Sequence, residues 1–137
     1  MDKEKKQELQ QKYMEMQMID QQINQIKKQI ELIDNQLQEL TITQEALNSI
    51  SKTKPETEIL VPLASGIFIK SQLVDNKEVI VNVGAGTTVK KTIPEAGELI
   101  KQQLTEITTF RKELEGTLAQ LASKANQLQK ALEEIAK

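Results

Sequence analysis

The stretch Gly84-Ala85-Gly86-Thr87-Thr88 is the part of this 137-residue chain that most resembles a phosphate-binding loop. Closely spaced glycines let backbone N–H groups surround a phosphate. The dinucleotide pattern, however, needs a third glycine, and position 89 is Val. The P-loop needs Gly-Lys-Ser/Thr, and neither the lysine nor the spacing is present. We therefore expect a tight hairpin turn here and no cofactor.

The residue types that the chain lacks restrict its chemistry further. It contains no Cys and no His, which removes disulfides, thiol nucleophiles, imidazole bases and nearly every zinc site. The Asp and Glu residues are spread along expected solvent-facing helix positions without an evident cleft, and nothing argues for an acidic metal site. We expect no catalytic residue, no metal and no enzymatic activity.

The charge pattern argues against two kinds of partner. The net charge is −2 and the two signs are interspersed, so neither a nucleic-acid surface nor a polybasic membrane patch is expected. The N-terminus, MDKEKKQELQQ, is charged from its second residue, and no apolar run approaches the length of a membrane span. A cytoplasmic protein is the default expectation.

A cluster of methionines points to binding rather than catalysis. All four methionines and the only tyrosine fall in the first 18 residues: Met1, Tyr13, Met14, Met16 and Met18. Thioethers are flexible and polarizable, and they suit surfaces that accept many partners. Near the C-terminus, alanines fill a helix interface poorly and leave larger neighbours partly accessible. We predict an apolar groove for unfolded chains, built from Tyr13, Met14, Met16, Met18, Ile19, Leu128, Leu132 and Ile135.

In the alternative interpretation, most of these residues only fill the seam between two helices. Alternating steps of three and four residues from Leu9 to Leu47 are apolar at ten of twelve positions. The same test from Ile100 to Ile135 gives ten of eleven. Such spacing over five heptads is typical of a coiled coil. The matched lengths favour one intramolecular antiparallel coiled coil over parallel pairing with another chain.

Three polar residues, Lys12, Gln44 and Arg111, interrupt the predicted seam. Polar residues at such positions fix register at some cost in stability. We expect Arg111 to lay its stem over the seam and to place its guanidinium in water.

Local signals divide the chain into three parts. Pro55 ends the first helix, and Thr92-Ile93-Pro94-Glu95 fits a capping box that opens the second. We therefore predict an N-terminal coiled-coil helix in residues 1–52, an oligomerisation platform in residues 53–92 and a C-terminal coiled-coil helix in residues 93–137.

The central part reads as four short strands: Ile59–Leu63, Ile67–Leu73, Glu78–Val83 and Thr87–Lys91. Gly and Asp/Asn turns between apolar runs are the marks of hairpins. Four short strands leave open edges and an apolar face that a slender coiled coil cannot cover. We predict that other chains complete them, through Ile59, Val61, Ile67, Phe68, Ile69, Val79, Val81, Val83 and Val89.

The order helix, two hairpins, helix, with VPLASGIFIK, EVIVNVGAGTTVKKT and Thr92-x-x-Glu95-Ala96, resembles the alpha-type subunit of prefoldin over essentially the whole chain. The resemblance implies a mainly α, α+β fold: a long antiparallel coiled coil with two central β-hairpins that join a multi-subunit β-barrel. It also implies a hexamer of two alpha-type and four beta-type subunits. Family members often carry an aromatic residue soon after the Gly-Ala-Gly turn, where this chain has Thr87 and Thr88.

The function that the resemblance implies is that of an ATP-independent chaperone, a holdase. Its coiled-coil tips would hold unfolded client proteins and pass them to the cytosolic group II chaperonin. The alternative is a structural coiled-coil tether, which explains the heptads and strands but not the clustered methionines. Binding of many unrelated denatured proteins distinguishes a holdase from a tether.

Overall fold

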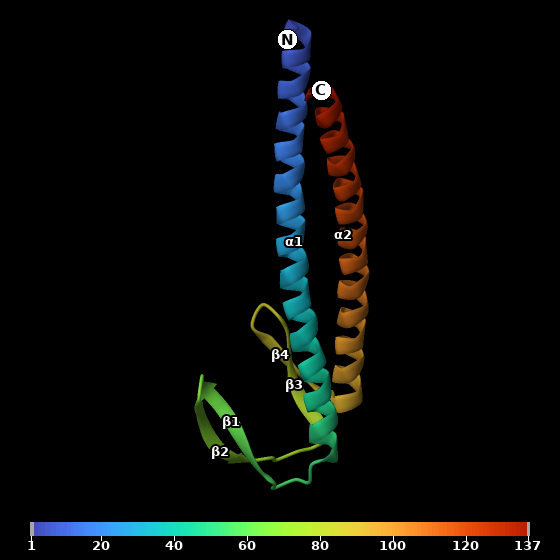
Figure 1. Cartoon of the computed structure of the whole chain (residues 1–137). Helices are drawn as coiled ribbons and strands as arrows, with labels where there is room; N and C mark the ends of the chain where they lie inside the picture. Colours follow the sequence, from blue (N-terminus) through green and yellow to red (C-terminus); the bar gives the residue numbers. More distant parts are fainter. Residues whose placement is uncertain (1, 137) are drawn as a thin grey trace. The chain divides into compact units, whose positions relative to one another are not determined.

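A computed structural model describes residues 2–136 and contains two long helices and two β-hairpins (Figure 1). In chain order the elements are α1 (Lys3–Lys52), β1 (Glu58–Ala64), β2 (Ile67–Gln72), β3 (Glu78–Gly84), β4 (Thr87–Thr92) and α2 (Ile93–Ala136). The predicted mainly helical α+β fold is confirmed, and each strand ends within one residue of its expected bound.

The chain forms two compact units, each of which contains part of both helices. Unit 1 comprises residues 1–37 and 106–137, and unit 2 comprises residues 38–105. This division falls inside the helices, so the three-part functional division expected from the sequence stays a prediction.

In unit 1 the two helical segments run side by side in opposite directions, with both chain ends at one end of the unit (Figure 1). Ile19, Ile33 and Leu128 are buried between them. Every other predicted seam residue of this unit is half-buried, while most of their neighbours are exposed. The 3.5-residue repeat therefore predicted the contact face correctly, and the antiparallel intramolecular pairing is confirmed here.

An ion-pair cluster crosses the seam of unit 1. Arg111 Nε donates a hydrogen bond to Asp34 Oδ1 at 2.6 Å, and Arg111 Nη2 donates to Asp34 Oδ2 at 3.3 Å. Arg111 Nη1 also pairs with Glu115, one helical turn further along α2. The guanidinium thus pairs with Asp34 of the opposite helix at a position that solvent still reaches, a partner that the sequence did not predict.

The hydrogen bonds from Arg111 hold the pKa of the Asp34 carboxyl below its ordinary value. The same hydrogen bonds, which the Asp34 carboxylate accepts, raise the pKa of Arg111. Both groups are substantially exposed, so solvent screens their attraction. The pair therefore contributes more to the register of the two helices than to stability.

In unit 2, local signals set the ends of both helices. α1 ends at Lys52, shortly before Pro55, because proline disfavours helical geometry in the residue before it. At the start of α2, Glu95 N donates to Thr92 Oγ1 at 3.2 Å, and Thr92 N donates to Glu95 Oε1 at 3.4 Å. These reciprocal bonds confirm the predicted capping box, and the hydrogen bonds from Thr92 lower the pKa of Glu95.

The four strands form two separate antiparallel hairpins, β1–β2 and β3–β4. Each closes through a two-residue turn with a register shift just before it. The second turn is formed by Ala85 and Gly86, which both have positive φ, at 51° and 73°. Gly84 N also donates to the side chain of Asn82 at 2.9 Å. The glycine-rich stretch is thus the predicted hairpin turn, in which Ala85 and Gly86 both adopt the left-handed backbone conformation that the turn needs.

The expectation that the coiled coil cannot cover any of the strands was wrong for the β3–β4 hairpin. One face of β3–β4, which carries Val79, Val81 and Val89, is half-buried. Val79 and Val81 lie across a cleft of about 310 Å³ from Leu99 and Ile100 of α2. Because α2 begins directly after β4, the hairpin starts beside this helix and is partly covered by it.

Gln44, which interrupts the predicted seam in this part of α1, is exposed and lines a recess of unit 2.

Candidate functional site

The first candidate surface lies at the end of unit 1 that carries both termini, which we call the tip (residues 2–19 and 128–136). Tyr13, Met14 and Met18 are 56, 64 and 60% exposed. Met14 and Met18 are four residues apart on α1, so they lie one helical turn apart on the same exposed side of the helix. Large apolar side chains are therefore presented to solvent where helix packing does not require them.

The structure places the remaining predicted tip residues in the seam. Ile19 and Leu128 are only 5 and 8% exposed, and Met16, Leu132 and Ile135 are half-buried. Met18 and Ile19 share a small recess of about 140 Å³ with Lys124 of α2. The eight residues thus form an exposed set and a seam set rather than one open groove, and Met1 lies outside the described residues.

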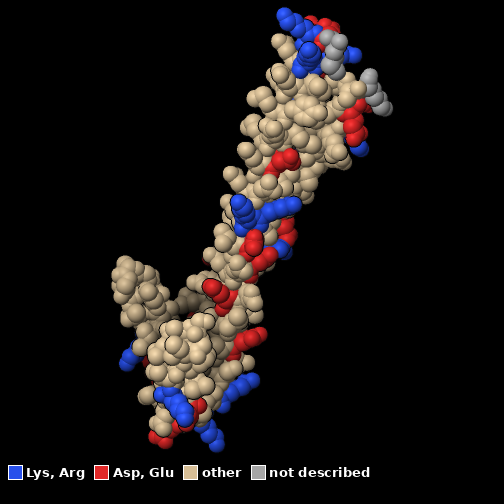
Figure 2. Space-filling model, turned by 60° about the vertical axis from the view of Figure 1, so that its left-hand side comes forward, with Lys and Arg blue, Asp and Glu red and all other residues tan. Residues whose placement is uncertain are grey.

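The second candidate surface is the β1–β2 hairpin of unit 2. Val61 pairs with Ile69 and Pro62 pairs with Phe68, so these two pairs lie on opposite faces of the sheet. All four residues are exposed, and no charged residue occurs from Ile59 to Ile69. Both faces of this hairpin are apolar and uncovered, and the lobes of unit 2 show wide uncharged surfaces (Figure 2).

Sequence reasoning missed part of this surface. Leu60 and Leu63 of β1 and Ile80 of β3 are exposed apolar side chains that were not among the predicted contact residues. Of the predicted set, Val61, Ile67, Phe68, Ile69 and Val83 are exposed, and Ile59, Val79, Val81 and Val89 are half-buried. For Leu60 and Leu63 the signal was a run of apolar residues in β1 that does not alternate with polar ones.

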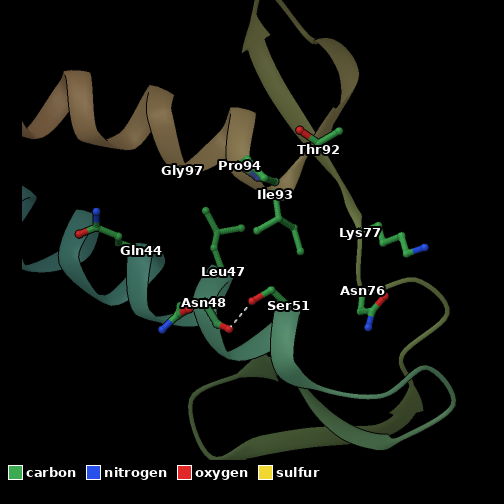
Figure 3. A pocket seen from close by; sticks show the side chains of 10 residues that line it. All are labelled: Gln44, Leu47, Asn48, Ser51, Asn76, Lys77, Thr92, Ile93, Pro94 and Gly97. Carbon is green, nitrogen blue, oxygen red and sulfur yellow. Dashed lines mark hydrogen bonds between the residues drawn. The ribbon is translucent and has the colours of Figure 1, made fainter.

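A third feature, also missed from the sequence, is a recess of about 610 Å³ in unit 2. It lies between the end of α1, the start of α2 and the chain that leads into β3 (Figure 3). Leu47 and Ile93 point toward one another across its floor, and Gly97 leaves an opening in the wall that α2 forms.

The rim of this recess is polar and lacks carboxylates. It is formed by Gln44, Asn48, Ser51, Asn76 and Lys77. Asn76 Nδ2 donates to Thr53 O at 3.1 Å and so attaches the loop between the hairpins to the end of α1. An apolar floor with a polar, weakly basic rim can accept an apolar side chain from another polypeptide.

Within residues 2–136, no group of three or more Asp and Glu side chains is arranged to hold a metal ion. Over the same residues, neither helix has an apolar stretch long enough to span a membrane.

Comparison with known proteins identifies the family. Residues 19–137 match the family model of prefoldin subunits. The chain belongs to the prefoldin family. It is 34% identical over 100 residues to prefoldin subunit alpha of Pyrococcus horikoshii, covering 73% of this chain and 66% of that protein. It is 35% identical to prefoldin subunit alpha of Methanopyrus kandleri, covering 85% and 77% of the two chains. The alpha-type assignment made from the two hairpins is confirmed.

A solved structure agrees with the prefoldin fold. The cryo-EM structure of filamentous PFD from Methanocaldococcus jannaschii superposes with a TM-score of 0.74 at 23% sequence identity. The match covers 84% of this chain and 95% of that chain. The fold of this chain, with two hairpins between two long helices, is therefore shared with a solved prefoldin structure.

The family gives the chain a general role. Prefoldin is a family of chaperone subunits, and this alpha-type subunit assembles with other prefoldin subunits in a complex. Two hairpins with uncovered apolar surface are consistent with a chain that is completed by other subunits.

Proposed function

We propose that this prefoldin subunit is part of an ATP-independent holdase, which binds unfolded proteins at its tip and delivers them to the cytosolic group II chaperonin. Its assembly is a hexamer of two alpha-type and four beta-type subunits, in which the hairpins join a shared β-barrel. We infer a cytoplasmic protein without enzymatic activity and without nucleic-acid or membrane partners.

The uncovered hairpin supports the assembly. The side chains of Leu60, Val61, Phe68 and Ile69 are exposed to water. Burying their apolar surface in an interface would stabilise the assembly by about 25 cal/mol per Å². An isolated two-stranded hairpin is marginal at best. Strands from neighbouring subunits would satisfy both the open edges and the apolar faces.

The exposed thioethers support the site of client binding. Met14 and Met18 offer a small apolar contact that adapts to many side chains. Tyr13 adds an aromatic ring with a polar end. The seam residues Met16, Ile19, Leu128, Leu132 and Ile135 would join the contact where the ends of the helices separate.

The mechanism follows from weak contacts made many times. One tip presents only a few exposed apolar side chains, so its affinity for one client segment is low. Several tips that hold one unfolded chain raise the overall affinity through effective concentration. Release needs no nucleotide because each contact dissociates readily by itself.

The observation that carries the proposal is the exposure of Met14 and Met18 on the outer face of α1. Replacing both (Met14→Ser and Met18→Ser) should weaken client binding roughly tenfold, since partial burial of two such side chains contributes about 1–2 kcal/mol. The measurement is suppression of the aggregation of several unrelated denatured proteins by the complete assembly.

Leu32→Ser is the matched control, because Leu32 is also 64% exposed on the outer face of α1 but lies outside the tip. It should leave suppression unchanged, and both variants should assemble to the size of the wild type. Unaltered suppression by the methionine variant would contradict the tip site. Binding of a single native protein and of no denatured ones would favour the tether.

A further inference from the structure

Unit 1 contains a band that is almost free of charge. It consists of residues 16–26 of α1 and 116–129 of α2, which we call the amide band. Its 25 residues include only two charged ones, Asp20 and Lys124, although charged residues make up 28% of the chain. Lys124 lines the same small recess as Met18 and Ile19, so the two segments lie side by side.

Charged residues border the band on both sides. Toward the N-terminus, six of the seven residues from Asp2 to Glu8 are charged. In the other direction, Lys27, Lys28 and the Asp34–Arg111–Glu115 cluster follow. Figure 2 shows the corresponding uncharged surface between charged clusters of this unit.

Amides occupy nine of the seventeen exposed positions of the band. Gln17, Gln21 and Gln25 of α1 and Gln120 and Gln127 of α2 are all exposed. The solvent face of a coiled coil is ordinarily charged, so a face of amides needs another explanation than solubility. Each amide presents a donor and an acceptor and can pair with the N–H and C=O groups of a polypeptide backbone.

The absence of charge determines which ligand fits. A fixed charge keeps its water, and covering it without a partner is costly. A client segment that lies over the amides and thioethers displaces exchangeable water, and Asp20 and Lys124 are the charged side chains of the band that it has to avoid. Backbone groups are common to all sequences, so such a contact selects for unfolded chains and against charged segments rather than for a particular sequence.

We propose that the amide band extends the client site, and that it binds extended, uncharged stretches of unfolded polypeptide through their backbone groups. The proposal rests on the holdase function proposed above and specifies its substrate class. Eleven helical residues span about 16 Å, and an extended strand rises about 3.3 Å per residue. One band therefore accommodates about five client residues beside the methionines.

The experiment adds charge to the band in the complete assembly. The variant Gln17→Glu/Gln25→Glu keeps side-chain size and helix propensity. The probe is a fluorescent synthetic peptide of Ser, Ala, Leu, Val and Gln, read by anisotropy. Its affinity should fall about fivefold in the variant, and in the wild type it should change less than about twofold between 0.05 and 0.5 M NaCl. A matched peptide with Glu at every third position should bind the wild type about tenfold more weakly.

The control is Gln38→Glu/Gln102→Glu, which adds the same charge at exposed positions of unit 2. It should bind the peptide as the wild type does. If the band variant also binds normally while the Met14→Ser/Met18→Ser variant does not, the amide band is not part of the site and the holdase function stands. If neither variant loses binding, both proposals fail. A band variant that changes only the sedimentation of the assembly would instead identify a contact between copies and overturn the inference.

Discussion

Unit 1 and unit 2 differ in how completely the chain covers its own apolar side chains. In unit 1 each helix covers the seam of the other, and the large apolar side chains that stay exposed include Tyr13, Met14, Met18, Leu32 and Phe110. In unit 2 the β1–β2 hairpin leaves both faces exposed. One partner helix is wide enough to cover a heptad stripe. A two-stranded sheet, by contrast, has two faces to bury and two edges whose backbone groups need hydrogen-bond partners.

The two hairpins of unit 2 show the same difference on a smaller scale. β3–β4 is half-covered on the face of Val79 and Val81, whereas the β1–β2 pairs of Val61 and Pro62 are exposed on both faces. The first hairpin thus depends on other subunits more than the second does.

The largest effect is expected from the two phenylalanines, which form a matched pair. Phe68 in β2 and Phe110 in α2 are each about half exposed in the isolated chain. Phe68→Glu should prevent assembly, because it removes an aromatic anchor and leaves a carboxylate unpaired in an interface, at a cost of about 3 kcal/mol or more. Phe110→Glu, in unit 1, should leave assembly intact. Native mass spectrometry with the partner subunits measures the assembly of both variants. Equal assembly by both would contradict the view that unit 2, and not unit 1, carries the subunit interface.

An intermediate effect is expected from two helical glycines. Neither Gly97 in unit 2 nor Gly116 in unit 1 has an atom within 4 Å of an added Cβ. Gly→Ala at either site should stabilise α2 by up to about 1 kcal/mol, because alanine has the higher helix propensity. Thermal unfolding followed by circular dichroism measures this.

Only Gly97 lines the recess of about 610 Å³. If a neighbouring subunit fills that recess, Gly97→Leu should weaken assembly while Gly116→Leu does not. Normal assembly by both leucine variants would show that the recess stays open to solvent.

The smallest effect is expected from pH. Arg111 lowers the pKa of Asp34 in the folded state, so the pair contributes stability above the ordinary pKa of 3.8. That contribution is lost as pH falls below this value and through the folded pKa. Arg111→Met should remove this part of the acid sensitivity of unit 1 and leave stability at pH 7 nearly unchanged, because solvent screens the attraction between these exposed groups. Unfolding midpoints measured from neutral pH to below pH 3.8 test this, and an unchanged acid profile would contradict it.

Those predictions rest on features with different origins. The heptad repeat determined which helix residues face inward, since the position of a side chain on a helix follows from its spacing alone. Pro55, the Thr92–Glu95 capping box and the Gly84–Gly86 turn determined where the elements end, because each acts on the backbone within a few residues. These local effects are independent of the rest of the fold, and the sequence sufficed to predict them.

Only the tertiary structure decided which distant segments meet. Arg111 pairs with Asp34, 77 residues away, and a heptad pattern does not specify that partner. Gln44 fits the repeat yet lies exposed beside the recess, and Val79 fits a strand whether or not a helix covers it. Such outcomes depend on the register and approach of elements that are far apart in the chain, and a local pattern is the same whether a face is covered or open.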